Sequence, residues 1–327
     1  MVKQFKGRSL ITLLDYSSEE IDFIVNYAID LKKKKQNRVF NHNLTDRNFA
    51  LIFDKPSCRT RSSFVTAAND EGAHLEIYPR EDIRFGIKES VKDIARVLGR
   101  MFDGIAYRGS DDILLELAKY AGVPVWNGLS DKYHPTQALA DLMTLKERFN
   151  GYKGIKMAYI GDGRNNVAIS LIIASLKMGI DLRIISHKSL HPKAELVDEI
   201  IKKCRETNDL NGSVLITDDL TEGLKECDAV YGDVWVSMGE EDLIDERITI
   251  LKKFKVTKEL IAMTGKQDTI YLHCLPALHD QSTEMAVKHP EIHEVENDVF
   301  EMENSLVFDQ AENRMHTIKA LMVLTVQ

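Results

Sequence analysis

Short apolar runs alternate with helical patterns along the first part of the chain. The run at 49–53 (FALIF) predicts a buried strand, and residues 61–71 have the spacing of a helix. The same pattern predicts strands at 74–78, 104–107 and 124–126, and helices at 90–101 and 112–121. Strands that alternate with helices in this way predict a parallel sheet covered by helices on both faces.

A second series of the same kind begins after the segment 150–154 (NGYKG), whose composition is typical of a hinge. A strand at 155–160 leads into the turn Gly161-Asp162-Gly163 and a helix from about residue 165 to 178. Further strands are predicted at 182–186, 213–217, 229–231 and 269–273, and a last helix at 313–326. The expected fold is α/β with two domains, 1–149 and 150–327. Each is a parallel sheet flanked by helices, and the C-terminal helix returns to the first domain.

Composition and charge narrow the class of protein. The length of 327 residues suits two domains rather than one core. A net charge of -8 argues against a nucleic-acid binder, and the four lysines at 32–35 are typical of a solvated helix end. The N-terminus lacks the apolar core of a secretory signal, and no run approaches the roughly 20 apolar residues of a membrane span.

The four cysteines indicate a reduced environment. They are Cys58, Cys204, Cys227 and Cys274, and they are scattered without the paired spacing of a metal site. In a chain of this length the pattern is typical of free thiols in a cytoplasmic protein. We therefore expect no bound metal, no nucleic-acid partner and no membrane association.

Candidate chemistry lies where predicted strands run into helices, because ligands of parallel sheets bind at the carboxyl ends of the strands. The first such loop is Ser57-Cys58-Arg59-Thr60-Arg61. Free N–H groups at a helix start attract anions, and guanidinium forks match phosphate oxygens. A capped helix start with surface arginines remains an alternative for this short motif.

Three further loops have the same setting. The segment 134–137 (HPTQ) opens a helix, and its histidine and glutamine can bind a carbonyl or phosphate oxygen, although simple capping is equally consistent. The segment 272–276 (LHCLP) ends a strand, so its cysteine is a further candidate site residue. A single thiol at the end of a strand is, however, also typical of buried packing. The segment 233–239 (DVWVSMG) offers a carboxylate and a hydroxyl to an ammonium group, or is a plain loop.

Together, these loops and three longer segments resemble the ornithine carbamoyltransferases over nearly the whole chain. The longer segments are 53–55 (FDK), 93–101 (DIARVLGRM) and 308–317 (FDQAENRMHT). The resemblance implies a transferase that moves the carbamoyl group of carbamoyl phosphate to the δ-amine of L-ornithine, giving L-citrulline and phosphate. It implies no cofactor, and a homotrimer with active sites at subunit boundaries.

The resemblance also assigns roles to individual residues. In the first domain and the last helix it implies a carbamoyl phosphate site, with further groups from the HCLP segment. Its members are Ser57, Cys58, Arg59, Thr60, Arg61, Arg108, His134, Gln137, Cys274, the Leu275 carbonyl and Arg314. In the second domain it implies an ornithine site, made of Asn166, Asp233, Ser237 and Met238. The catalytic residues implied are Arg59, Arg108, His134, Asp233, Cys274 and Arg314.

Two positions depart from the family pattern. Cys58 stands where the phosphate loop usually has threonine, so a side-chain hydroxyl is lost while the backbone N–H remains. Arg84 stands where a neighbouring subunit usually supplies a glutamine. We expect this arginine to reach the phosphate from the neighbouring chain.

The expected mechanism is direct attack of a neutral δ-amine on the carbamoyl carbon through a tetrahedral intermediate, followed by loss of phosphate. Rival functions are transfer to putrescine or aspartate, nicotinamide-dependent oxidoreduction and ligand binding without catalysis. The segment 237–239 (SMG) favours ornithine over the first two acceptors. The turn Gly161-Asp162-Gly163 lacks the third glycine of a dinucleotide motif, since position 166 is Asn166. Retention of both His134 and Cys274 argues against a protein that only binds.

Overall fold

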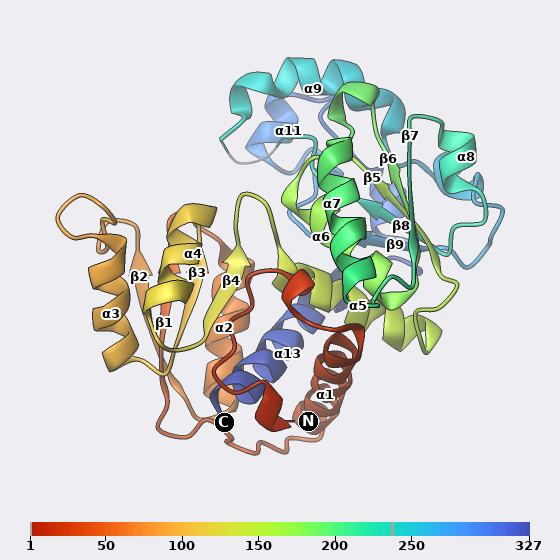
Figure 1. The fold of residues 1–327 in the computed structure, drawn as a ribbon. Coiled ribbons are helices and arrows are strands. Elements are labelled where there is room, and N and C mark those ends of the chain that lie inside the picture. The colour runs from red at the N-terminus through yellow and green to blue at the C-terminus, as the bar shows by residue number, and fades with distance from the viewer. Residues whose placement is uncertain (1, 237–238) are drawn as a thin grey trace. The chain divides into compact units, whose positions relative to one another are not determined.

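Four parallel strands form the sheet of the first structural unit, in the order β2-β1-β3-β4. The computed structural model describes residues 2–236 and 239–327. This unit comprises the chain up to Thr144 together with Glu312–Gln327 (Figure 1). Its elements are α1 (Ser18–Gln36), β1 (Asn48–Phe53), α2 (Cys58–Asp70), β2 (His74–Pro79), α3 (Val91–Met101), β3 (Gly104–Arg108), α4 (Asp111–Tyr120), β4 (Val125–Leu129), the greater part of α5 (Pro135–Phe149) and most of α13 (Val307–Val326).

Helices cover both faces of this sheet. On one face α3 and α4 enclose a core that includes Ala50, Ile52, Ile105, Tyr107 and Val125. On the other, the rings of Phe49 and Trp126 meet edge-on at 5.3 Å, and Phe64 of α2 stacks on Trp126 at 6.2 Å. The Trp126 indole donates to Thr325 Oγ1 of α13 at 3.1 Å. The last helix therefore packs against the first sheet, as predicted.

Five parallel strands form the sheet of the second unit, Leu145–Ala311, in the order β7-β6-β5-β8-β9. Its elements are β5 (Lys156–Ile160), α6 (Asn166–Met178), β6 (Asp181–Ile185), α7 (Ala194–Glu206), β7 (Ser213–Thr217), α8 (Leu220–Leu224), β8 (Ala229–Gly232), α9 (Ile244–Leu251), α10 (Lys258–Ala262), β9 (Ile270–His273), α11 (Glu284–Lys288) and α12 (Asn297–Phe300). Single-turn 3₁₀ helices in the two units span Val2–Gln4, Leu13–Asp15, Lys188–Leu190, Glu241–Leu243 and Lys252–Phe254.

The core of the second unit lies on both sides of its sheet. Every residue from Val167 to Lys177 of α6 is buried, as expected of a helix enclosed on all sides. A second cluster joins Ile160 and Val230 of the sheet to Trp235, Ile244 and Ile248, which lie in or near α9. Two parallel sheets flanked by helices confirm the predicted fold class. The boundary at 149/150 and the ligand assigned to each half remain predictions.

Three element boundaries differ by three residues or more from those predicted. The helix predicted from residue 61 begins at Cys58, because the Ser57 hydroxyl caps it by accepting from the Thr60 N–H at 3.3 Å. The strand predicted at 124–126 runs on to Leu129. The last helix begins at Val307 rather than 313, since its polar first turns hide the apolar spacing. Apart from the helix end at 32–35, helices α1 and α7 to α12 were not predicted from the sequence.

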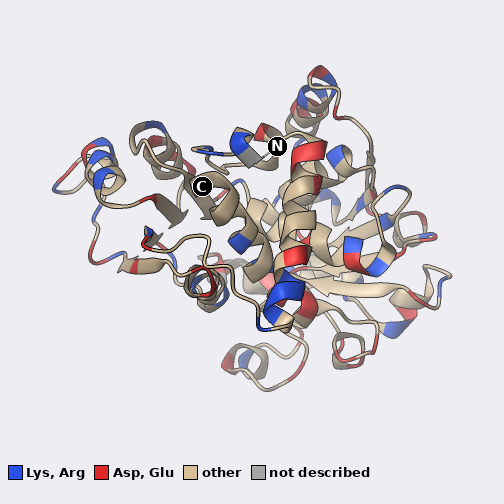
Figure 2. Ribbon diagram, turned by 90° about the horizontal axis from the view of Figure 1, so that it is seen from below, with Lys and Arg blue, Asp and Glu red and all other residues tan. Residues whose placement is uncertain are grey.

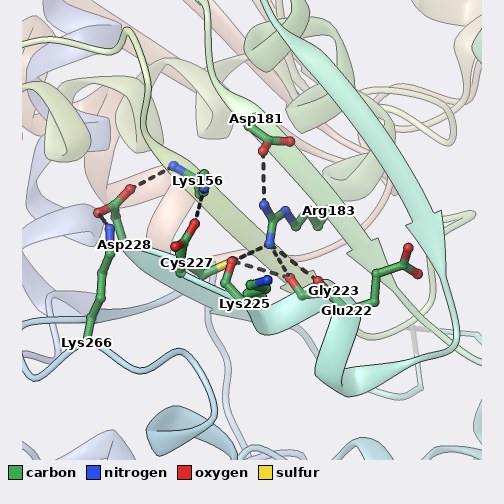
Figure 3. A network of polar contacts seen from close by, with 10 residues as sticks. Lys156, Asp181, Arg183, Glu222, Gly223, Lys225, Cys227, Asp228 and Lys266 are labelled. Atoms are coloured by element: carbon green, nitrogen blue, oxygen red, sulfur yellow. Dashed lines mark hydrogen bonds and ion pairs between the residues drawn. The ribbon is translucent and has the colours of Figure 1, made fainter.

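Charged side chains at the amino end of the second sheet pair mainly with one another and with backbone carbonyls (Figure 3). Asp228, just before β8, accepts from the Lys156 N–H at 2.8 Å and pairs with the Lys266 ammonium. Arg183 pairs with Asp181 at 3.1 Å and donates to the carbonyls of Glu222, Gly223 and Lys225. The charged side chains named here are thus paired within the second unit.

Acidic and basic residues are interspersed along the helices of the chain (Figure 2). None of the helices within 2–236 and 239–327 combines the length and the apolar composition that crossing a membrane requires.

Candidate active site

Each sheet has one point where its strand order changes direction. In the first sheet this point lies between β1 and β3, and in the second between β5 and β8. Loops diverge to opposite faces there, which leaves a crevice at the carboxyl ends of the two strands. The loop Ser57–Arg61 follows β1, and Arg108 ends β3. Asn166 follows β5 and Asp233 follows β8, so the topology places the predicted residues at both crevices.

The loop after β1 forms the capped start of α2. Ser57 is the cap, and its hydroxyl also lies 3.1 Å from Thr60 Oγ1, which is buried. Arg59 and Thr60 thus fall in the first helical turn, where free N–H groups and the helix dipole favour an anion. Cys58 and Arg61 are exposed and line a small cleft of about 370 Å³.

Four other predicted residues of the first unit are buried, although all are polar. They are Arg108, His134, Gln137 and Arg314. Arg314 of α13 donates through Nη1 to Gln137 Oε1 at 3.0 Å, and the same nitrogen lies 3.4 Å from His134 Nε2. Gln137 in turn donates to Asp141 Oδ1 at 2.7 Å. The last helix and the start of α5 are held together by these contacts.

The first unit concentrates positive charge around a neutral imidazole. Burial lowers the pKa of His134 well below its usual range, and the charges of Arg314, Arg108 and Arg59 lower it further. His134 is therefore neutral at pH 7, while three guanidinium groups retain their charge. A group of arginines that are wholly or partly buried is suited to a small, highly charged anion.

In the second unit several polar groups converge on the carboxylate of Asp233. Asp233 is buried, and its Oδ2 accepts from the Tyr159 hydroxyl at 2.9 Å and from Asn165 Nδ2 at 2.5 Å. Its Oδ1 accepts from the Val234 N–H at 2.9 Å and from the Cys274 thiol at 3.2 Å. Four donors thus fix a buried negative charge, as burial of a carboxylate requires.

Tyr159 and Asn165 were not predicted. Burial raises the pKa of Tyr159 well above its usual range, and the Asp233 carboxylate raises it further. The Tyr159 hydroxyl therefore stays protonated and acts as a donor, with the Asp233 carboxylate at 2.9 Å and the Asp162 carbonyl at 3.1 Å as its acceptors. A tyrosine inside a strand is typical of core, so its sequence carried no signal. Asn165 stands beside the predicted Asn166, and it also caps α6 by accepting from the N–H groups of Val167 and Ala168.

The segment after β9 positions Cys274 and Leu275. Cys274 is only half-buried, and its contact with Asp233 shows that it does more than fill the core. Leu275 adopts the left-handed conformation, with φ of 59°, and its N–H donates to His273 Nδ1 at 2.9 Å. Such a backbone is costly for a branched residue, by about 1–2 kcal/mol, and persists where the surroundings fix it.

The remaining predicted residues are less closely grouped. Asn166 opens α6 and is half-buried, and its carbonyl accepts from the Ser170 hydroxyl at 2.7 Å. Arg84 is exposed on the loop after β2 and lines a cleft of about 780 Å³ with Asp54 and Ser110. Ser237 and Met238 lie outside the described residues. Across the described residues, no group of three or more metal-ligating side chains comes together.

The two units thus form an α/β protein with an arginine-rich crevice in one sheet and a fixed carboxylate in the other. A family model for the carbamoyl-P binding domain of aspartate/ornithine carbamoyltransferases matches residues 8–147. A second, for the Asp/Orn binding domain of the same family, matches residues 153–325. The chain belongs to the aspartate/ornithine carbamoyltransferase family, which excludes the nicotinamide-dependent alternative.

Individual relatives match over nearly their full lengths. An anabolic ornithine carbamoyltransferase 2 of Pseudomonas savastanoi pv. phaseolicola is 50% identical over 326 residues, 99% of each chain. A catabolic ornithine carbamoyltransferase of Staphylococcus aureus is 49% identical over 98% of this chain and 96% of its own. The structure of ornithine carbamoyltransferase from Pyrococcus furiosus superposes with a TM-score of 0.89, at 39% identity over 98% of each chain.

Proposed function

We propose that the chain transfers the carbamoyl group of carbamoyl phosphate to the δ-amine of L-ornithine, giving L-citrulline and phosphate. The observation that carries this proposal is the opposite charge of the two crevices. One surrounds a neutral histidine with Arg59, Arg108 and Arg314, and the other holds the Asp233 carboxylate. Relatives that are 49–50% identical to this chain over nearly their whole length bear the name ornithine carbamoyltransferase.

Carbamoyl phosphate suits the first crevice because it is an acyl phosphate, with an anionic phosphate bonded directly to a carbonyl group. The start of α2, with Ser57, Arg59 and Thr60, is the proposed seat of the phosphate, assisted by the Cys58 N–H, Arg61 and Arg314. Arg108, His134 and Gln137 are the proposed partners of the carbamoyl group. A neutral His134 can bind the carbonyl oxygen without releasing a proton, and the arginines stabilise charge that develops on it.

Ornithine suits the second crevice because its ammonium group can pair with Asp233. The carboxylate of Asp233 is held in place by four donors, and its negative charge attracts an ammonium group. Aspartate would bring a second carboxylate toward this buried charge, and like charges in a desolvated site repel strongly. We propose that Asn166, Ser237 and Met238 bind the other polar groups of ornithine, as the family resemblance implies.

The proposed reaction forms one bond and breaks one. The neutral δ-amine attacks the carbamoyl carbon, which gives a tetrahedral intermediate with its charge on the former carbonyl oxygen. The bond to the phosphate oxygen then breaks, and the amine nitrogen loses its extra proton to the departing phosphate or to solvent. Cys274 and the Leu275 carbonyl are proposed to lie beside the reacting group. Holding both substrates in line supplies much of the rate.

Phosphate release with each acceptor offered separately tests the proposal. With carbamoyl phosphate present, we expect citrulline and phosphate from ornithine, and a rate on the order of 10⁴-fold lower from putrescine, because a site with buried polar partners rejects an analogue that lacks them. Aspartate should give none. Equal rates with ornithine and putrescine would overturn the assignment of the second crevice, whereas no phosphate release with any acceptor would overturn both.

We also propose a cytoplasmic homotrimer in which Arg84 serves the neighbouring subunit. All four cysteines are free thiols, and Arg84 is exposed on the loop after β2, where it lines a cleft with Asp54 and Ser110. Chains with Arg84→Ala and with Arg59→Ala should each be impaired, and mixed trimers should regain activity because some sites contain both wild-type residues. Mixed trimers without any recovery would place Arg84 outside the site of its neighbour.

A further inference from the structure

Arg247 is a buried cation near the second crevice that the reaction itself does not use. It lies on α9, and only 3% of it is exposed. Its Nη1 lies 3.0 Å from Asp162 Oδ2 and its Nη2 lies 3.6 Å from Glu240 Oε1. Burial of an arginine is costly unless its charge is paired. The carboxylates of Asp162 and Glu240 offset this cost for Arg247. A single guanidinium thus joins two separate segments of the unit.

The first of these segments contains the groups that fix Asp233. Asp162 lies in the turn between β5 and α6, and its carbonyl accepts from the Tyr159 hydroxyl at 3.1 Å and from the Asn165 N–H at 3.2 Å. Tyr159 and Asn165 are the two side chains that donate to Asp233 Oδ2. A shift of Asp162 would therefore move both donors, and with them the carboxylate.

The second segment follows Asp233 and carries the residues assigned to the acceptor. Glu240 stands at its far side, directly after Gly239, and is about 40% exposed. Trp235 stands at its near side, buried in the same apolar cluster as Ile244 and Ile248 of α9. Helix α9 therefore contacts described residues on either side of 237–238, through packing at Trp235 and through the ion pair of Arg247 with Glu240.

We propose that Arg247 is a positioning residue for the amino-acid acceptor. By pairing with Asp162 and Glu240 together, it fixes the turn that carries Asn165 and Asn166 relative to the segment that begins at Asp233. The inference rests on the proposed function, because the acceptor is taken to be ornithine. An arginine is needed because its planar fork presents donors to two acceptors at once, whereas a lysine presents a single ammonium.

Steady-state kinetics of Arg247→Gln, Arg247→Lys and Glu240→Gln test the proposal. We expect Arg247→Gln to raise KM for ornithine on the order of 10- to 100-fold, because small misplacements at a site have effects of this size. KM for carbamoyl phosphate should not change. Arg247→Lys should recover part of the loss by retaining the charge. Glu240→Gln, at a partly exposed position, should raise KM for ornithine by less, and its effect should not add to that of Arg247→Gln, because both break one link.

Arg183→Gln is the matched control. Arg183 is also an arginine of the second unit with little exposure, and it pairs with Asp181 and three carbonyls at the opposite end of the same sheet (Figure 3). Its loss should lower the melting temperature and leave KM for ornithine unchanged. An unchanged KM for ornithine in Arg247→Gln and Glu240→Gln would overturn the proposal while wild-type citrulline formation still stands. Equal rises in both substrates' KM would make Arg247 merely structural. If the wild-type chain formed no citrulline, the proposed function would fail instead.

Discussion

The two crevices use one topology for opposite electrostatic purposes. Each lies where the strand order of a parallel sheet changes direction, and each takes its polar groups from the loops that follow the strands. In the first, arginines surround a buried neutral His134 and present donors. In the second, Tyr159, Asn165 and Cys274 all donate to Asp233. The group proposed to face the ligand there is therefore a negatively charged carboxylate. The two crevices thus share a topology and differ in the charge of a few side chains, and the ligands proposed for them differ accordingly.

Asp233→Asn should break the second crevice with the largest effect. Whichever way the amide is placed, its nitrogen would face a group that can only donate, either Asn165 Nδ2 or the Val234 N–H. The charge that pairs with an ammonium would also be lost. Removing one partner of a buried pair costs about 3–5 kcal/mol, so we expect kcat/KM for ornithine to fall by about 10²- to 10⁴-fold. KM for carbamoyl phosphate should be nearly unaffected.

Asp228→Asn is the control at the other end of the same strand. Asp228 precedes β8 and accepts from the Lys156 N–H, as Asp233 follows β8 and accepts from the Val234 N–H. We expect the Asp228 variant to lose stability and to retain its kinetics. A similar loss of kcat/KM in both variants would mean that the carboxylates act only through the stability of β8.

Arg59→Lys should weaken the first crevice by a smaller amount. The charge would remain, but the fork that can contact two phosphate oxygens would be lost. A hydrogen bond to a charged group contributes about 1.5–3 kcal/mol, so we expect KM for carbamoyl phosphate to rise by about 10- to 100-fold. Arg47→Lys is the matched control, because Arg47 directly precedes β1 and pairs with Asp103 at an exposed position. Normal kinetics in Arg59→Lys would remove Arg59 from the site.

The smallest expected effect is on the pH dependence of stability, and it comes from a buried residue outside both crevices. His316 of α13 is buried beside Glu312 and is not part of either crevice, and burial lowers its pKa to about 4. Between pH 4 and the ordinary value of 6.5, the unfolded chain binds a proton that the folded chain does not. Stability is therefore full above pH 6.5 and is lost as the pH falls toward 4.

His316→Gln should reduce this loss. One proton corresponds to a slope of about 1.4 kcal/mol per pH unit, and the buried His134 contributes in the same direction. Denaturant midpoints of both chains, measured across this pH range, give the two slopes. We expect the variant to lose stability less steeply with acid, with kinetics at neutral pH retained. Identical slopes would mean that His316 gains no proton on unfolding.

Much of the fold was predictable because strands and helices have strong local patterns. The buried runs that became β1 and β5 are almost wholly apolar, and the loops after them are rich in polar residues. The family resemblance then named Arg59, Arg108, His134 and Arg314 from motifs far apart in the chain. The structure brings the last two within 3.4 Å of each other.

The residues that the sequence did not reveal act through pairings that no local pattern encodes. Tyr159 lies in an otherwise apolar strand and so has the pattern of a core residue. Its hydroxyl donates to Asp233 only because β5 pairs with β8 in the folded sheet. Arg247 sits on a helix with acidic neighbours and reads as a surface charge, yet it is buried against Asp162 from a distant turn. In both, the partner is more than 70 residues away in the chain.

The division of the chain also sets the order in which the two units are completed during translation. The first unit needs Glu312–Gln327, including Arg314, whereas the second is continuous from Leu145 to Ala311. Domains usually fold during translation from the N-terminus onward. Here the second unit is synthesised completely while the first still lacks the helix that covers Trp126 and supplies an arginine to its crevice. On the ribosome, the amino-terminal half of this chain is the last to be finished.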